Sequence, residues 1–401
     1  MERGGLRPVD KIWQALLWMV LGFVWLLWFQ VFCGHMWPRF AYLSGKPIGI
    51  DAPCVKPECD FSDFWRAGLT ARFPGITAPP PALAAPMAPD ARLPLPNGIQ
   101  DGFPYPPPAL LPSDAIAHLK FETGFFVWII AHAAIAIIAL RWARLSWLVI
   151  LAGLLSPAAL WNMELGQYGV VCGAILLAGL LRQTYAPGRA GLLLSLLSCK
   201  PQYGILLPSA LFGARSWRGL AAISLACFGI VLLTSAFFGF GSWWQWLHRG
   251  GQSGMSMLAA PFNPFMAQGA GTSSFWMLHS LGVPLHIASL IQAMISVFSV
   301  IGSFWVWRSG RFNVSEAAGL TILLTLLATP YGYVDDMVAG SWALAVLAQQ
   351  RAWRLQLADM LFWIWPAIGQ ITAERTGILL TPFVVGFAFW RVWRQAERRT
   401  I

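Results

Sequence analysis

Long apolar stretches alternate with short polar and basic segments along most of the chain. Residues 12–32 contain no charged side chain, and crossing about 30 Å of hydrocarbon takes roughly 20 helical residues. Comparable stretches follow at 121–140, 145–161, 166–181, 220–240, 285–307, 316–330, 337–350, 355–371 and 377–393. The pattern predicts an all-α polytopic membrane protein of about ten transmembrane helices, folded as one transmembrane domain over residues 1–401. The first stretch is too long for a cleaved signal peptide, so we expect it to remain as the first helix.

Residues 190–214 interrupt this pattern. They are apolar, but basic residues flank them on both sides and Lys200 lies in the middle, next to Pro201. A single span would break the positive-inside rule and place a lysine at mid-bilayer, which costs about 2.5–3.5 kcal/mol. We therefore predict a re-entrant hairpin over residues 190–214, broken at Pro201, with Lys200 at its tip inside the bundle.

The basic residues between the apolar stretches set the expected orientation. Arg3, Arg7 and Lys11 precede the first span, and a basic cluster at 391–399 follows the last. Because short cytoplasmic loops are enriched in Lys and Arg, we expect both termini in the cytoplasm of a bacterial cell, with the protein in the inner membrane. Residues 33–118 and 241–284 then form two extracytoplasmic loops.

Composition agrees with a membrane protein and excludes several other classes. The chain is 57% hydrophobic and 11% charged, more apolar than one soluble core of this size would hold. The formal charge of +10 comes from scattered short clusters, which argues against a nucleic-acid partner. Six cysteines form no CxxC pair, so a metal site is not predicted.

Carboxylates concentrate in the expected first outside loop. They are Asp51, Glu58, Asp60, Asp63, Asp90, Asp101 and Asp114. If residues 60–68 are helical, Asp60 and Asp63 lie on one side, while Phe61, Phe64 and Trp65 form an apolar stripe suited to the membrane surface. Such an interfacial helix either presents a base that deprotonates a hydroxyl group or is simply a solvated polar face.

Lys200 also has two interpretations. A buried ammonium needs an anion, and a lipid phosphate is the anion that a membrane offers. Alternatively, Lys200 forms a structural pair with Glu164 or an aspartate. Gln167 begins a span at the expected outer surface, where it either binds sugar hydroxyls or caps the helix. His132 lies within a predicted span, where a neighbouring helix more often satisfies such a histidine than catalysis employs it.

A second polar break follows residue 328. Tyr333, Asp335 and Asp336 lie there at the expected outer end of a span, where two adjacent carboxylates bind a cation or a sugar, or are solvated. Residues 78–112 are rich in Pro and Ala, which predicts coil or polyproline II. Cys54 and Cys59 share the expected oxidising compartment, so the sequence leaves a disulfide between them open.

Five short motifs together resemble the membrane glycosyltransferases of family 87, which have the C-class glycosyltransferase fold. They are DFSDFWRAG at 60–68, FPYPP at 103–107, GQ at 166–167, KPQ at 200–202 and TPYGYVDD at 329–336. Each is weak alone, but they occur in the family's order at compatible spacings. The insert at 74–101 matches no part of that pattern, and some relatives have a histidine near the position of Asp335 that this chain lacks.

The resemblance implies an inverting single displacement in which a monosaccharide passes from a polyprenyl-phosphate donor to a glycolipid or glycan acceptor on the extracytoplasmic face. Asp60 matches the family's acidic position and would act as general base, with Asp63 beside it. Lys200 would hold the departing phosphate, helped by Arg66. The other donor-binding residues would be Gln202, Gln167 and Tyr105, and Glu164, Tyr333, Asp335 and Asp336 would contact sugar or acceptor. No cofactor is required, because phosphate is a good leaving group.

A second class of function fits the same hydropathy pattern. A non-catalytic protein that binds, flips or transports a lipid-linked saccharide would also be polytopic, but it would need polar residues lining a path through the bilayer. Here the charges cluster at the expected outer face, with Lys200 as the main exception, and no internal repeat of the transporter kind is visible. The sequence therefore favours chemistry on one side of the membrane.

Overall fold

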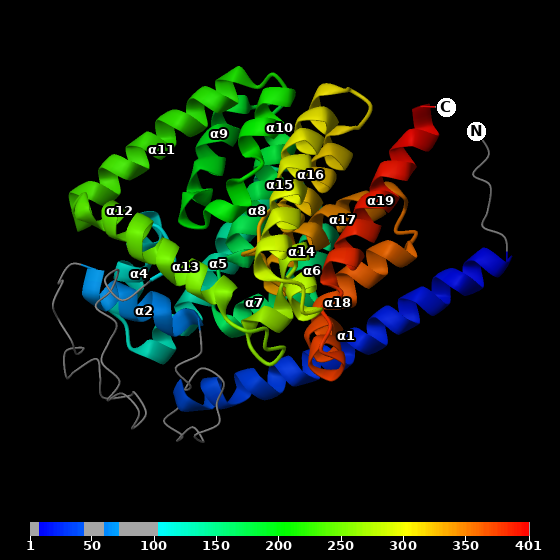
Figure 1. The fold of residues 1–401 in the computed structure, drawn as a ribbon. Helices are drawn as coiled ribbons and strands as arrows, with labels where there is room; N and C mark the ends of the chain where they lie inside the picture. Colours follow the sequence, from blue (N-terminus) through cyan, green and yellow to red (C-terminus); the bar gives the residue numbers. More distant parts are fainter. Residues whose placement is uncertain (1–7, 44–59, 72–102, 401) are drawn as a thin grey trace. The chain divides into compact units, whose positions relative to one another are not determined.

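The computed structural model describes residues 8–43, 60–71 and 103–400, which are almost entirely helical (Figure 1). Its elements include α1 (Pro8–Leu43), α2 (Asp60–Ala71), α4 (Leu110–Ala117), α5 (Phe121–Trp142), α6 (Trp147–Leu154), α7 (Pro157–Leu165), α8 (Gly169–Arg182), α9 (Pro187–Ser195), α10 (Leu207–Gly213), α11 (Trp217–Phe238), α12 (Gly241–Gln245), α13 (Gly251–Ala259), α14 (Ser274–Ser280), α15 (Leu285–Arg308), α16 (Val314–Ala328), α17 (Val338–Gln350), α18 (Leu357–Thr376) and α19 (Thr381–Thr400). No strand occurs within those ranges, only an isolated bridge between Gly271 and Tyr333. The expected all-α class is confirmed.

Helices of membrane-spanning length and composition lie at four of the predicted positions. They are Val9–Trp37, Phe121–Trp142, Trp217–Phe238 and Leu285–Arg308. The predicted span at 145–161 is instead two helices, α6 and α7, bent by 57° at a short break before Pro157, where the proline lacks the N–H that a continuous helix needs. Helices also occupy the remaining predicted positions, but they are shorter or less apolar. The described chain thus has four candidate spans, or five with the bent pair, where ten were expected.

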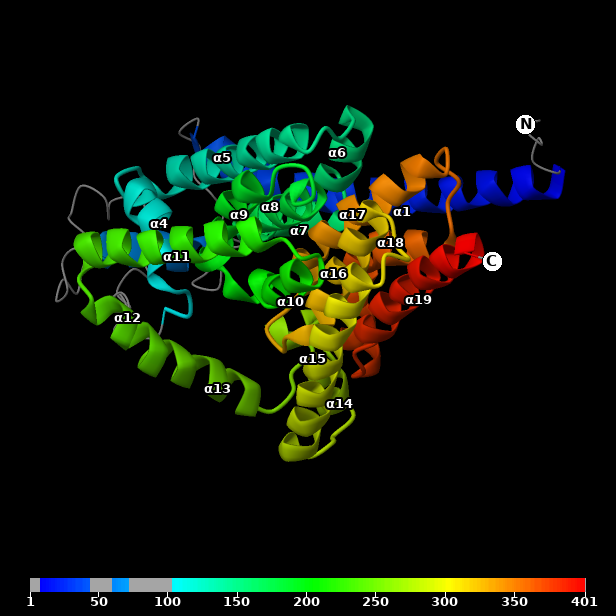
Figure 2. The same ribbon diagram turned by 90° about the horizontal axis from the view of Figure 1, so that it is seen from above.

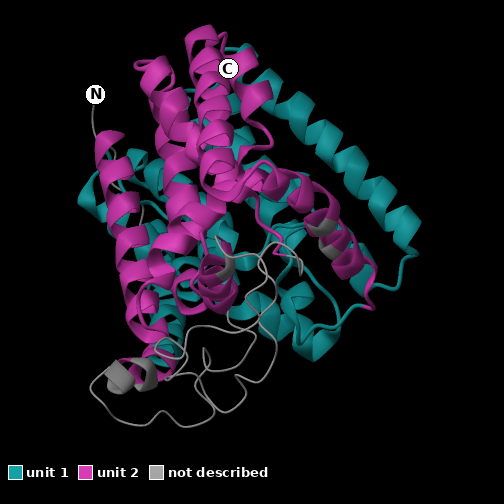
Figure 3. Cartoon of the chain, turned by 90° about the vertical axis from the view of Figure 1, so that its left-hand side faces the viewer, with its two compact units in different colours: residues 1–32, 144–161, 262–401 teal, residues 33–143, 162–261 magenta. Residues whose placement is uncertain are grey.

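The chain divides into two compact units (Figure 3). One contains residues 1–32, 144–161 and 262–401, and the other contains residues 33–143 and 162–261. We call them unit 1 and unit 2 and describe each by itself.

Unit 1 is built on helices α14 to α19, with α6 packed against α17. A Cβ atom on Gly153 would lie 2.1 Å from the Trp342 ring, so only glycine permits this approach of α6 to α17. The Trp342 indole also donates to the Ile150 carbonyl at 3.0 Å. The buried side-chain amide of Gln292 on α15 accepts a hydrogen bond from the Ser274 hydroxyl on α14 at 2.8 Å and donates one to the Leu327 carbonyl on α16 at 2.8 Å. These two bonds connect α14, α15 and α16.

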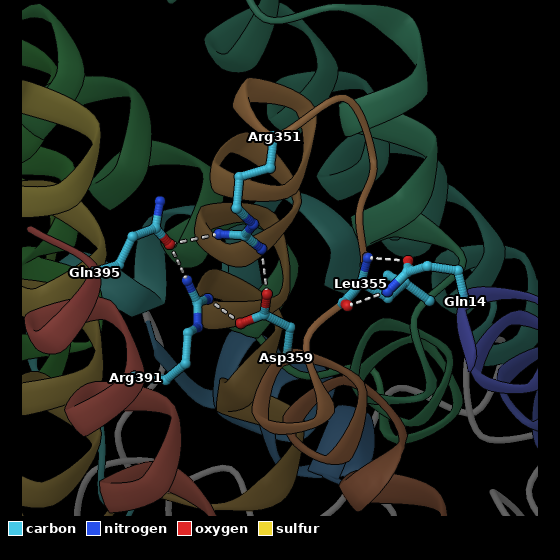
Figure 4. Close-up of polar contacts among 6 residues, drawn as sticks. All are labelled: Gln14, Arg351, Leu355, Asp359, Arg391 and Gln395. Atoms are coloured by element: carbon cyan, nitrogen blue, oxygen red, sulfur yellow. Dashed lines mark hydrogen bonds and ion pairs between the residues drawn. The ribbon is translucent and has the colours of Figure 1, made fainter. Parts of the chain in front are cut away.

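A buried ionic cluster joins the C-terminal helices of unit 1 (Figure 4). The two carboxylate oxygens of Asp359 on α18 accept from Arg351 and Arg391. Both guanidinium groups also donate to Gln395 Oε1, at 3.0 and 2.8 Å. Nearby, Gln14 on α1 pairs with both backbone groups of Leu355, at 2.8 Å each. The α17–α18 connection is thereby fixed to α19 and to the start of α1.

Unit 2 pairs α9 with α11, α5 with α8, and α2 with α4. Figure 1 shows α9 beside α11, and Figure 2 shows α12 and α13 continuing from the end of α11 at an angle to it. The α2–α4 contact is close, because a Cβ atom on Gly68 would lie 2.0 Å from the Ser113 carbonyl oxygen.

Residues 241–261 are part of the expected second loop at 241–284. They are largely helical, because α12 and α13 lie there.

The segment expected to form a hairpin consists of short helical pieces. After α9 come two 3-10 turns, η3 (Leu196–Cys199) and η4 (Pro201–Gly204), with Lys200 between them, and then α10. Lys200 has φ −138° and ψ 77°, outside the helical region, and Pro201 starts the next turn. The break at Pro201 therefore occurs where expected, and the placement of residues 190–214 in a membrane stays a prediction.

Candidate active site

Helix α2 carries the DFSDFWRAG motif and is held by its aromatic side chains. Phe61, Phe64 and Trp65 are fully buried. Phe61 packs against Phe125 with ring centroids 5.3 Å apart, and Phe64 stacks on Trp128 at 5.3 Å. The stripe expected to lie on the membrane surface instead packs inside unit 2. The prediction that this stripe faces the membrane is wrong, because neighbouring aromatic rings cover all three side chains.

Asp60 lies at the start of α2 in a short chain of side-chain hydrogen bonds. Gln167 Nε2 donates to Asp60 Oδ2 at 2.8 Å, and the Tyr105 hydroxyl donates to Gln167 Oε1 at 3.0 Å. These residues come from three separate motifs, FPYPP, GQ and the first residue of α2. The structure thus brings together one predicted base and two residues predicted to bind the donor.

The turn that carries Gln167 is held by buried groups. Gly166 has φ +72°, and a Cβ atom there would lie 2.6 Å from Phe61 Cβ, so this position requires glycine. The Trp128 indole donates to the Gly166 carbonyl at 2.8 Å. The backbone carbonyl of Asn162 accepts a hydrogen bond from the Gln167 N–H at 3.0 Å, and its side-chain Oδ1 accepts one from the Val170 N–H at 3.1 Å.

Asp63 lies one turn further along α2. Its side chain reaches solvent, but the surrounding protein crowds its carboxyl group and Asp60 adds a second negative charge nearby. These two effects raise the pKa of Asp63 to about 6 from 3.8, against a smaller lowering by Arg66. Asp63 therefore binds and releases its proton near neutral pH.

Lys200 is buried, and its ammonium lies 5.5 Å from the ring centre of Tyr203. The preceding turn η3 packs against α8 and against η2 (Pro107–Ala109), which directly follows the FPY segment containing Tyr105. Lys200 thus directly follows a turn that packs against α8, which begins two residues after Gln167, and against η2, which begins two residues after Tyr105. Gln202, on η4, is partly exposed.

Glu164 has a partner that the sequence did not indicate. Its Oε1 lies 2.6 Å from Nδ1 of His35. His35 is in the part of α1 that belongs to unit 2. The His35 side chain is 44% exposed, which makes this a partly solvated pair at the end of α7, two residues before the GQ turn.

Tyr333, Asp335 and Asp336 belong to unit 1. Asp335 and Asp336 are buried, and Asp336 Oδ2 accepts the Tyr333 N–H at 3.1 Å. The Trp276 indole donates to the Pro330 carbonyl at 2.8 Å, and the Thr272 N–H donates to the Gly332 carbonyl at 2.9 Å. Of the alternatives for these two carboxylates, simple solvation is wrong, because both side chains are buried, and binding of a cation or a sugar stays a prediction.

No group of three or more His, Cys, Asp or Glu side chains suited to a metal ion occurs in the described part of the chain. Cys54, Cys59 and the insert at 74–101 lie outside the described residues.

Several residues that build the site were not singled out in the sequence. Trp128, Asn162 and Tyr168 support the GQ turn, and His35 pairs with Glu164. They lie in apolar or unremarkable surroundings, and only their contacts across the fold reveal them. The nearest signal in sequence was His132, a polar residue within an apolar span.

The apolar helices indicate a helical membrane protein, and unit 2 holds a hydrogen-bonded group of polar side chains around Asp60. The family model of glycosyltransferase family 87 matches residues 103–330, more than half of the chain. The chain belongs to glycosyltransferase family 87, and it is therefore a membrane glycosyltransferase. The matched residues include Tyr105, Gln167 and Lys200, whereas Asp60 precedes them. No curated protein and no solved structure matches the chain.

Proposed function

We propose that this glycosyltransferase moves a monosaccharide from a polyprenyl-phosphate donor to a hydroxyl of a glycolipid or glycan acceptor, on the extracytoplasmic face of a bacterial inner membrane. The observation that carries the proposal is the bond between Gln167 and the Asp60 carboxylate within unit 2. A carboxylate with a fixed direction is suited to accept the proton of an attacking hydroxyl group.

The chemical step is an inverting single displacement. The acceptor oxygen forms a bond to the anomeric carbon while its proton passes to Asp60. The bond from the anomeric carbon to the phosphate oxygen breaks, and its electron pair leaves with polyprenyl phosphate. Lys200 pairs with the charge of that phosphate, since a buried ammonium is stabilised by an anion. Burial strengthens this attraction.

Asp63 and Arg66 take supporting roles in this scheme. Asp63, with its pKa raised to about 6, adjusts the charge next to Asp60. Arg66 lies on the same helix and helps to offset the negative charge of both the carboxylates and the donor phosphate. Gln202 and Tyr105 contact the donor, and Glu164 contacts sugar or acceptor.

A donor assay tests the proposal. Purified protein in lipid is incubated with a panel of polyprenyl-phosphate sugars and with nucleotide sugars, and release of polyprenyl phosphate is followed for wild type, Asp60→Asn and the control Asp114→Asn. We expect release by wild type and by the control, but not by Asp60→Asn. Equal turnover by Asp60→Asn would exclude Asp60 as the base. Consumption of nucleotide sugars alone would exclude the lipid donor.

The same preparation separates catalysis from the second class of function. A protein that only binds or flips lipid-linked saccharides would retain the lipid sugar through purification and leave it uncleaved. Mass spectrometry of the co-purified lipid, before and after addition of acceptor extract, distinguishes these outcomes and identifies the sugar.

Cysteine labelling tests the orientation. Gly188→Cys and Ser216→Cys flank the expected hairpin at 190–214, and both should react with an impermeant thiol reagent from the cytoplasmic side only. Labelling of the two positions from opposite sides would show that the segment crosses the membrane.

A further inference from the structure

We propose that Gln167 is a positioning residue that holds the Asp60 carboxylate for proton transfer, and that the packed ring of His132 supports the turn from which Gln167 acts. This inference rests on the proposed function, and it replaces the expectation that Gln167 binds the donor sugar. The residues concerned all belong to unit 2.

The amide group of Gln167 is occupied at both ends. Its Nε2 donates to Asp60 Oδ2 at 2.8 Å. Its Oε1 accepts from the Tyr105 hydroxyl at 3.0 Å and, more weakly, from the Tyr168 N–H at 3.4 Å. Two donors use both lone pairs of an amide oxygen. A sugar hydroxyl that donates to Oε1 would have to displace one of these two bonds, whereas positioning of Asp60 requires no rearrangement.

His132 lies behind this amide. Its ring is buried and packs 4.4 Å from the Trp128 ring centre and 5.2 Å from that of Tyr168. Trp128, His132, Asn162 and Gln167 line one narrow crevice. Since the Trp128 indole donates to the neighbouring Gly166 carbonyl, α5 supports the turn that carries Gln167 through this bond and through the packing of the His132 ring.

The chemical consequence concerns both direction and charge. An N–H donated to a carboxylate fixes its orientation and favours its ionised form. Removal of the Gln167 amide would therefore leave Asp60 less well oriented and easier to protonate. Asp63 and Arg66 lie on the same helix as Asp60, Tyr168 follows Gln167 in the chain, and Tyr105 and His132 lie near Gln167 on other elements. A substitution of Gln167 leaves these ionisable groups in place.

Two substitutions of Gln167 test the positioning role. Gln167→Leu removes the donor, and Gln167→Glu places a second carboxylate against Asp60. For Gln167→Leu we expect a fall in kcat of about tenfold or more with little change in donor KM. For Gln167→Glu we expect the acid limb of kcat/KM to move up by about one pH unit or more, because a like charge disfavours ionisation. Gln349→Leu, on an exposed glutamine that bonds Ser146, is the control.

A titration without turnover keeps this inference separate from the proposed reaction. Carbon-13 NMR of aspartate-labelled protein, with Asp60→Asn to assign the signal, measures the pKa of Asp60 in each variant whether or not the correct donor is known. A rise in both Gln167 variants supports positioning. An unchanged pKa of Asp60 would contradict the positioning role. A raised donor KM with no shift in the acid limb of kcat/KM would also contradict it, and either result would support the assignment of Gln167 to sugar binding. Loss of transfer by wild type on every lipid donor would contradict the proposed function alone.

His132 is tested by His132→Ala, which removes the ring that packs against Trp128 and Tyr168. We expect a smaller fall in kcat than for Gln167→Leu, with KM unchanged, and partial recovery in His132→Phe, which keeps a ring there. Wild-type kcat and an unchanged Asp60 titration in His132→Ala would remove His132 from the proposal. Gln167→Asn, whose shorter amide does not reach Asp60, serves as the second variant if Gln167→Leu does not fold.

Discussion

Two aspartates, Asp60 in unit 2 and Asp359 in unit 1, show how differently the same side chain is held. Asp359 is 5% exposed and lies between the guanidinium groups of Arg351 and Arg391 (Figure 4). Asp60 accepts from the neutral amide of Gln167. A carboxylate clamped by two cations is a poor base, because the charges hold it ionised. Asp359 is therefore suited to structure, whereas proton transfer is the role proposed for Asp60.

The largest expected effect separates the two aspartates by activity. Asp60→Asn should lower the transfer rate by about 10²- to 10⁴-fold, the usual contribution of a general base. The Tm of unfolding should stay unchanged. Initial rates and thermal unfolding in the same detergent measure both quantities. An inactive variant with a greatly lowered Tm would leave Asp60 as a structural residue and break the comparison.

The reciprocal change is Asp359→Asn. It leaves two buried guanidinium groups without their shared carboxylate, so we expect a loss of about 3–5 kcal/mol in the free energy of unfolding. Denaturant unfolding measures this loss. The activity of the folded fraction should remain near that of wild type, and a selective loss of activity at unchanged stability would contradict the structural assignment.

Lys200 gives the next largest effect. Lys200→Met removes the ammonium assigned to the donor phosphate, so donor KM should rise roughly 10- to 100-fold, as expected for a hydrogen bond to a charged group. Lys200→Arg should recover part of this loss. Steady-state kinetics at varied donor concentration provide the test, and an unchanged KM in Lys200→Met would exclude the phosphate role.

Asp63 should make stability depend on pH. Its folded pKa is about 6, above the ordinary value of 3.8, so the folded state binds more protons than the unfolded state between these values. Stability should therefore fall as pH rises from about 4 to 6, opposite to a carboxylate held by cations. Unfolding measured across this range should show a flatter profile for Asp63→Asn, and an identical profile would contradict the raised pKa.

The smallest effect concerns the partly solvated contact between His35 and Glu164. Because the His35 side chain is 44% exposed, Glu164→Gln should lower the free energy of unfolding by less than about 1 kcal/mol. Salt titration of the unfolding midpoint checks whether solvent screens the pair. A loss of unfolding free energy as large as that in Asp359→Asn would contradict the weaker contribution expected from the more exposed His35–Glu164 contact.

Sequence alone determined the class of the protein and much of its helical pattern. The apolar stretches at 121–140, 220–240 and 285–307 became long helices, because length and hydropathy are local properties. The motif order was enough to indicate family 87, which the family match confirms. The break at Pro201 also followed locally, since proline cannot continue a helix.

Tertiary structure decided what those elements do with their side chains. Hydropathy could not tell a lipid-facing helix from one covered by its neighbours, so Phe61, Phe64 and Trp65 were expected at a membrane surface and are buried. Nor could spacing along the chain show that Tyr105, Gln167 and Asp60 form one hydrogen-bonded chain. Such contacts join residues far apart in sequence, and their geometry exists only once α2, α5 and the GQ turn have packed together.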